Sequence, residues 1–394
     1  MELDCKKNLS VDEFLELESE RHQKAKPPKE AYLYFPTGND LIIYDSTNPY
    51  KSSRRVFYSK SKLYEFEEKK YEEFTNYLEN NPETNIAFPF DWQKQNTLRF
   101  LQAAGFDVKK AIELIQENIS WRLMFFPLKL NEHSKLILNS GFLYVHGRDS
   151  RYRPIVVLVA GEYVKKKDLY TYEEWVAAIV YFIEYLINNM LIPGQVENWV
   201  IITDVTNVSI LTYPPDLKRF LVLLQSNYRC RLITNYLIGM GYILSLMWNV
   251  LKSLMPTFEK KFKFIKKENK SELFEFINRS QIEKKFGGTA ENIEIGNFFP
   301  PNVPSSNYQL EDDNDGNSKN FVSEEKYVEL VKNDLVTTIS PYIRDYCQNI
   351  DRYFMYTAND TIENKSDFTK IQEGMLFFSL FRINLRASEL NIGY

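Results

Sequence analysis

The chain has few of the residues on which disulfide bridges, metal sites and acid-base chemistry usually depend. Its 394 residues include three cysteines and three histidines. Cys5, Cys230 and Cys347 lie far apart and match none of the spacings that bind zinc or build a disulfide framework. No metal or other cofactor is therefore expected, and a reducing compartment is favoured over secretion. The first residues lack an apolar signal core, and Glu2 follows Met1, so neither a secretory signal nor a myristoyl site is expected.

An excess of charge of one sign is also missing. The chain has 49 lysines and arginines against 53 acidic residues, a formal net charge of −4. This balance gives no reason to expect a nucleic acid partner. Aromatic residues make up 15% of the chain, which favours bulky apolar walls. The length is enough to bury a sizeable core in one large or two small domains.

Common catalytic motifs are absent as well. The sequence has no Gly-x-Ser-x-Gly elbow, no phosphate-binding loop and no His-Glu-x-x-His helix. His146 stands at the end of an expected strand, where a lone histidine is more often a hydrogen-bonded surface residue than a general base. Asp204, at the end of another expected strand, is interpreted as a structural carboxylate that binds nearby turn amides. The protein is accordingly not expected to be an enzyme.

The stretch 232–265 is interpreted as the one on which the rest of the fold depends, and its first part, 232–251, is an uncharged run of twenty residues. We predict a buried strand at 232–238, a turn at Gly239 and Gly241, and a helix at 242–255 that is apolar around most of its circumference. Such a helix suits a movable lid over an apolar cavity. Three alternatives stay open: a membrane span, for which the run is long enough, a plain core helix, and a dinucleotide-binding turn that lacks its third glycine.

Apolar segments alternate with helical patterns in the middle of the chain. Strands are predicted at 154–160, 199–205 and 232–238, and helices at 171–191 and 215–228. This alternation predicts a mainly parallel sheet with right-handed crossovers.

Helical patterns also precede this region. An amphipathic helix is predicted at 63–79, and Asp107 is a good N-cap for a second helix at 108–125 after a break at Gly105. The expected division of the chain is an exposed N-terminal arm at 1–62, a helical lobe at 63–130, an α/β domain at 131–297, a partly disordered linker at 298–322 and a helical C-terminal extension at 323–394.

Several segments, in the same order along the chain, resemble the signature of the CRAL-TRIO family of lipid-binding domains, which includes the secretory phosphatidylinositol/phosphatidylcholine transfer proteins. They are Leu-Arg-Phe-Leu-Gln-Ala-Ala-Gly-Phe-Asp-Val at 98–108, Trp-Arg at 121–122, Gly-Arg-Asp-Ser-Arg-Tyr-Arg-Pro at 147–154, Trp-Val-Ile-Ile-Thr-Asp at 199–204, and Lys-Phe-Gly-Gly-Thr at 285–289. Two positions depart from the family pattern. Tyr152 stands where glycine is usual, and residues 228–231 are Tyr-Arg-Cys-Arg in place of Tyr-Pro-Glu-Arg.

The resemblance implies an α/β CRAL-TRIO fold, a mainly parallel sheet flanked by helices with a mobile lid helix, preceded by an all-α lobe. It also implies a protein that takes up one phospholipid, with phosphatidylinositol as a candidate, or another hydrophobic ligand, and exchanges it with membranes. The residues expected to line the cavity are Val157, Tyr181, Tyr185, Trp199, Met247, Trp248, Leu251 and Phe264. Those expected to meet a head group are Arg99, Thr257, Lys260, Lys261 and Lys263.

Lysines surround Phe262 and Phe264 near the expected lid. If 261–265 is a strand, the two phenylalanines share one face and Lys261 and Lys263 point to the other. The lysines could serve a solvated strand edge that discourages pairing, or a transient contact with an anionic membrane. We expect a cytoplasmic, peripherally membrane-associated protein. The alternative function is a protein-interaction or regulatory module with a degenerate CRAL-TRIO fold and no lipid exchange, using 323–394 to bind a protein partner.

Overall fold

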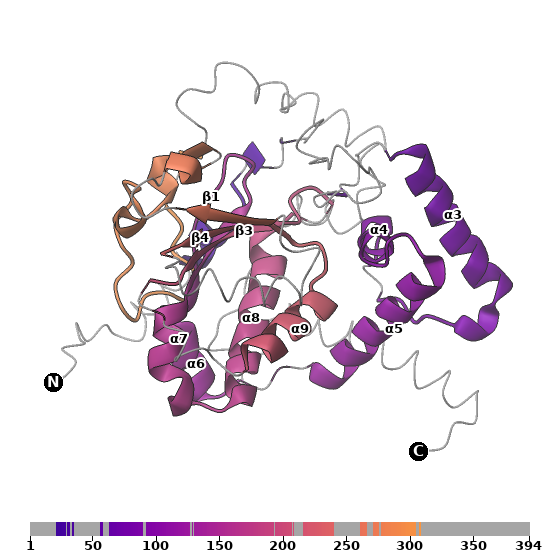
Figure 1. Ribbon diagram of the computed structural model, residues 1–394, viewed down its shortest axis with the longest axis horizontal. Helices are drawn as coiled ribbons and strands as arrows, with labels where there is room; N and C mark the ends of the chain where they lie inside the picture. Colours follow the sequence, from indigo (N-terminus) through magenta and orange to yellow (C-terminus); the bar gives the residue numbers. More distant parts are fainter. Residues whose placement is uncertain are drawn as a thin grey trace.

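Five strands in chain order form one sheet at the centre of the computed structural model (Figure 1). The structure describes residues 21–28, 30–31, 34, 56–57, 63–89, 92–126, 128, 130–192, 194–206, 208, 216–239, 261–265, 271–275, 277–304 and 307–308. The predicted lid helix at 242–255 and the predicted extension at 323–394 lie outside these residues.

The strands are β1 (Leu143–Arg148), β2 (Pro154–Val159), β3 (Trp199–Asp204), β4 (Leu232–Ile238) and β5 (Phe262–Ile265). The helices are α3 (Glu65–Asn80), α4 (Lys94–Ala103), α5 (Val108–Phe125), α6 (Glu132–Leu138), α7 (Ala160–Lys166), α8 (Tyr172–Met190) and α9 (Leu217–Asn227). Short 3-10 turns are η3 (Pro82–Thr84), η4 (Lys167–Leu169), η7 (Ser271–Glu275), η8 (Arg279–Gln281) and η9 (Lys284–Phe286).

The sheet is mainly parallel, as predicted. β1 pairs antiparallel with β2, and the pairs β2–β3, β3–β4 and β4–β5 are parallel. The predicted strands and helices of this region agree with the observed ones to within one or two residues at each end. Because β4 occupies 232–238, the uncharged run at 232–251 is not one continuous helix, and the membrane-span alternative is wrong. None of the helices in the described part of the chain is long and apolar enough to cross a bilayer.

Successive side chains of a strand point to opposite faces of the sheet, so each face has its own cover. On one face Val156 and Trp199 pack against α8. On the other face Val157 and Val200 pack against apolar residues between Leu273 and Phe298. Figure 1 shows α6, α7, α8 and α9 on the first side and the segment after β5 on the second.

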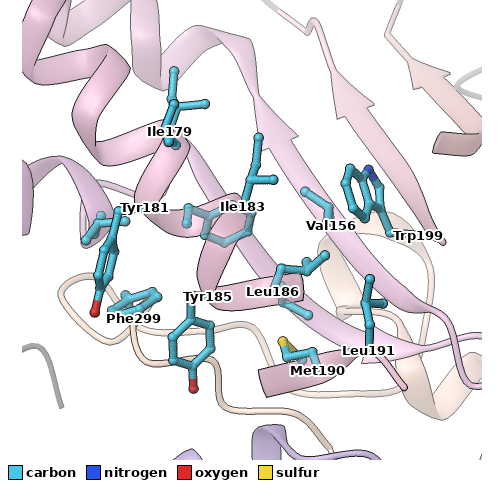
Figure 2. Packing of buried hydrophobic residues seen from close by; sticks show 14 of the residues in the cluster. Val156, Ile179, Tyr181, Ile183, Tyr185, Leu186, Met190, Leu191, Trp199 and Phe299 are labelled. Atoms are coloured by element: carbon cyan, nitrogen blue, oxygen red, sulfur yellow. The ribbon is translucent and has the colours of Figure 1, made fainter. Parts of the chain in front are cut away.

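Helix α8 supplies most of the cover on its side. Thr171 and Glu174 form a capping box at its start, and the apolar residues that follow bury the helix against the sheet. Figure 2 shows Ile183 and Leu186 of α8 near Val156 and Trp199.

Residues 298–301 and Val303 are buried, which differs from the predicted linker at 298–322. The side chains of Phe298, Phe299 and Val303 are all buried. The ring of Phe299 lies against Tyr181 and Tyr185 of α8, with centroid distances of 5.7 and 4.8 Å (Figure 2). Aromatic burial of this size stabilises the fold and anchors the segment.

The described residues between 21 and 34 also differ from the predicted exposed arm, because they pack on the domain. His22 Nδ1 lies 2.8 Å from the hydroxyl of Tyr185. The amide of Gln195 donates to the carbonyl oxygens of Ala31, at 3.0 Å, and Tyr34, at 2.6 Å. Burial, and then the charge of Lys26, lowers the pKa of His22 to about 4, so this histidine is neutral at physiological pH.

The helical lobe has its own apolar core and is tied to the domain by α5. The predicted N-cap is confirmed, since Asp107 accepts a hydrogen bond from the Lys110 amide at 3.0 Å. Arg122 of α5 donates to both carboxylate oxygens of Glu184 on α8, at 2.9 and 3.0 Å. Because two hydrogen bonds hold the guanidinium and the carboxylate in one geometry, this pair sets the orientation of the lobe on the domain as well as linking the two.

The turn between β1 and β2 is built around a buried arginine. Arg148 is fully buried, and its guanidinium donates to the carbonyl oxygens of Tyr152, Met190 and Ala25 at 2.8, 2.9 and 2.7 Å. Tyr152, in the position where the family has glycine, adopts a left-handed φ of 60°. Asp149 accepts from the backbone amides of Arg151 and Arg153 and helps to hold this conformation.

We expect Arg148→Met to lower the free energy of unfolding by about 3 kcal/mol, because three buried carbonyl oxygens would lose a charged donor. The measurement is chemical denaturation followed by circular dichroism. Lys135→Met is the control, since Lys135 is partly exposed and pairs only with Glu132 one turn away, and its change should stay within about 0.5 kcal/mol. Equal stability of the two variants would contradict a role for Arg148 in joining the segments.

Candidate functional site

The candidate site lies on the side of the sheet that faces α8, which we call the helix-side face. Register across the parallel strands places Asn235 between Ile201 and Phe262, and Thr203 between Leu158 and Leu237. Residues paired in this way share a face. The helix-side face of β2 to β5 consists of Val156, Leu158, Trp199, Ile201, Thr203, Leu232, Asn235, Leu237, Phe262 and Phe264.

None of these ten side chains is charged, and two, Thr203 and Asn235, are polar. The face is buried under α8 at Val156 and Trp199 and becomes more open toward β5, where Phe264 is 42% exposed. An uncharged surface of this kind favours the alkyl or ring parts of a ligand over ions.

The carboxyl end of β4 is followed by a glycine with a left-handed backbone conformation. Gly239 has a φ of 79°, and a Cβ at this position would lie 2.2 Å from Thr206 Oγ1. Only glycine therefore fits there. Asp204 at the end of β3 accepts a hydrogen bond from the Thr206 amide at 2.8 Å, which confirms its predicted structural role.

Residues 138–288, which contain all five strands and helices α7, α8 and α9, match the family model of the CRAL/TRIO domain. This part of the chain is a CRAL/TRIO domain. The match confirms the predicted family, and the sheet with its flanking helices confirms the predicted α/β fold. The family is one of lipid-binding and lipid-transfer domains.

Two further proteins are similar to the chain. Patellin-6 of Arabidopsis thaliana is 23% identical over 226 residues, which cover 54% of this chain and 54% of Patellin-6, so the match spans about half of that protein. The crystal structure of Sfh5 aligns with 70% of this chain and 100% of its own, at 14% identity and a TM-score of 0.46. The domain assignment depends on the family match and not on this structural likeness.

The predicted cavity residues that the structure describes lie in three different places. Trp199 and Phe264 lie on the helix-side face, and Tyr181 and Tyr185 lie on α8 against Phe299. Val157 packs on the opposite face, and because neighbouring residues of a strand alternate it cannot line the same side of the sheet as Trp199. Met247, Trp248 and Leu251 lie outside the described residues.

The residues of the helix-side face that were not predicted from the sequence are Val156, Leu158, Ile201, Thr203, Leu232, Asn235, Leu237 and Phe262. All lie in or beside strands that were predicted correctly. The alternation within each strand could have assigned them to one of two faces, but only the pairing register shows which face the strands share.

Arg99, predicted to meet a head group, has a partner inside the protein. It forms a buried ion pair with Glu197, whose carboxylate also accepts from Arg231 at 3.0 Å and from the Gly194 amide. Arg99 therefore joins α4 of the helical lobe to the loop before β3. Burial, and then repulsion from Arg99, lowers the pKa of Arg231 to about 10.

The remaining predicted head-group residues flank or lie in β5. The amine of Lys263 is 3.1 Å from a carboxylate oxygen of Glu275 and lies over the Tyr236 ring, on the face opposite Phe264. Lys261 directly precedes β5, and Thr257 and Lys260 lie outside the described residues.

His146 is hydrogen-bonded, as predicted, but it is buried and not at the surface. Its ring Nδ1–H donates to the carbonyl oxygen of Gln281 at 2.9 Å. Within the described ranges no group of three or more histidine, cysteine or acidic side chains could hold a metal ion.

We expect Glu197→Gln to destabilise the protein by about 3 kcal/mol or more at pH 7, because two buried arginines would lose their shared counter-charge. Burial alone would raise the pKa of Glu197, but the charges of Arg99 and Arg231 hold it below its ordinary value of 4.5. A carboxylate with a lowered pKa stabilises the folded state above pH 4.5, and this contribution is lost as the pH falls through the lowered pKa.

The difference in unfolding free energy between wild type and Glu197→Gln should therefore shrink toward acidic pH. Denaturation midpoints between pH 7 and pH 3 measure it. Glu132→Gln changes an exposed carboxylate and is the control, with an expected effect below about 0.5 kcal/mol at every pH. If Glu197→Gln lost the same unfolding free energy at every pH, the result would argue against an ionic origin of the destabilisation.

Proposed function

We propose that this protein binds one hydrophobic lipid against the helix-side face of its CRAL/TRIO domain and exchanges it with membranes. The observation that supports this most directly is the uncharged apolar surface that continues from Trp199, under α8, to the more exposed Phe264 on the edge strand. A phospholipid, with phosphatidylinositol among the candidates, or another hydrophobic molecule would suit it.

Binding of this kind requires no covalent chemistry. Removing alkyl chains or rings from water contributes about 25 cal/mol for each Å² of apolar surface buried. The chain enters residues 240–260 directly after Gly239, at the carboxyl end of the strand beside Phe264. We place the lid in that segment, with Met247, Trp248 and Leu251 as its proposed contacts to the lipid.

We expect Phe264→Asp to reduce lipid capture and transfer at least tenfold, because a carboxylate on this face would have to be desolvated beneath the ligand. Transfer of a fluorescent phospholipid between vesicles measures the rate, and mass spectrometry of the purified protein measures the bound lipid. Ile295→Asp is the control, since Ile295 is 85% exposed and lies outside this face.

Normal transfer by Phe264→Asp would contradict the site. A wild-type protein that neither contains lipid nor moves it between vesicles would favour the alternative, a protein-interaction or regulatory module whose partner could bind through 323–394.

We also propose a transient contact with anionic membranes through Lys260, Lys261 and Lys263. β5 is an edge strand of the sheet, where lysines also disfavour pairing with a strand of another molecule. This role is compatible with membrane contact. A peripheral, cytoplasmic location is part of this proposal.

Replacing both Lys261 and Lys263 by alanine should weaken binding to vesicles with anionic lipid, because each lysine near the surface contributes about 1 kcal/mol, or roughly fivefold. Vesicle sedimentation at low and high salt measures this, and the difference should vanish at high salt. Lys165→Ala serves as the control because Lys165 is an exposed lysine of α7, far in sequence from β5. Equal binding of wild type to neutral and anionic vesicles would count against the contact.

A further inference from the structure

Two polar atoms on the helix-side face have no hydrogen-bond partner in the described structure: Oγ1 of Thr203 and Oδ1 of Asn235. Both side chains are more than nine-tenths buried, with 9% and 8% exposure. Buried polar atoms in folded proteins almost always have a partner, and one left without a partner costs free energy.

The surroundings of both side chains are apolar. The pairing register places Thr203 between Leu158 and Leu237, and Asn235 between Ile201 and Phe262. None of these four neighbours offers a side-chain donor or acceptor.

Thr203 and Asn235 are diagonal neighbours on adjacent strands, because Asn235 pairs with Ile201 and Thr203 pairs with Leu237. Standard strand spacing and rise give a Cα–Cα distance of about 8 Å for such a pair. Both side chains project from the same face, so one ligand group can be in reach of both.

We infer that Thr203 and Asn235 bind a free hydroxyl group of the hydrophobic ligand. This inference depends on the proposed function. The ligand hydroxyl donates to Asn235 Oδ1 and accepts from the hydroxyl of Thr203, so both unpartnered atoms are satisfied at once. A hydroxyl both donates and accepts, and it therefore fits whichever way the asparagine amide is turned.

The absence of charged side chains from the helix-side face further restricts the chemical class of the ligand. It carries no lysine, arginine or histidine, so a phosphate or carboxylate seated there would be buried without a counter-charge. The ligand class is a neutral lipid alcohol, with its hydroxyl on the sheet and its hydrocarbon against the apolar residues around it.

The test compares wild type with the double variant Thr203→Val, Asn235→Leu. Each full-length protein is incubated with neutral phosphatidylcholine vesicles that contain equal amounts of an alcohol, its methyl ether and the parent hydrocarbon. One set of probes is cholestanol, its methyl ether and cholestane, and the other is hexadecanol, its methyl ether and hexadecane. Captured molecules, phosphatidylcholine included, are quantified by mass spectrometry after the protein is re-isolated.

Wild type should prefer the alcohol of at least one set over both of its analogues by about tenfold, the effect of one hydrogen bond. The double variant should lose that preference while it captures the same total amount of lipid. Its ligand-free melting temperature should not fall, because apolar replacements of similar shape remove the unpartnered atoms. Thr234→Val, a buried threonine on the opposite face of β4, is the matched control and should keep the preference.

The inference is overturned if wild type captures lipid without preferring an alcohol in either set, or if the double variant keeps the preference. It is also overturned if the ligand-free double variant melts lower than wild type, because the two side chains would then serve the fold. A folded wild type that captures none of the probes and no phospholipid would instead refute the proposed function itself.

Discussion

Parallel strands have to be covered on both faces, since their apolar side chains alternate between the two sides of the sheet. Here β2, β3, β4 and β5 run parallel, and the segment that ends at Phe298 closes one face. On the other face α8 lies over Val156 and Trp199, and the apolar surface extends beyond it to Phe264. The candidate site lies on this second face.

Buried polar groups divide into those that the fold satisfies and those that it does not. The guanidinium of Arg148 meets three carbonyl oxygens, and Glu197 meets two arginines and a backbone amide. Thr203 and Asn235 instead keep unpartnered atoms on the face assigned to the ligand. The satisfied groups named here join the segments, and the two unpartnered atoms on the helix-side face are available for recognition.

Segments distant in sequence complete the domain. Residues between 21 and 34 bind to Tyr185, Arg148 and Gln195, and Phe299 packs on α8 from the other end of the described chain. Helix α8 therefore packs on the sheet and also contacts segments from both ends of the described chain. The core of the domain therefore extends beyond residues 138–288, the part that matches the family model.

The sequence by itself determined the local elements, because strand alternation, helix periodicity and the cap at Asp107 depend on residues close together in the chain. It also determined the family through motifs such as the one at 285–289. Only the tertiary structure decided which residues share a face. Val157 packs on the face opposite Trp199, Arg99 forms an ion pair with Glu197, and Asn235 is a diagonal neighbour of Thr203. Register and long-range charge pairing set these neighbours, and neither leaves a local pattern in the sequence.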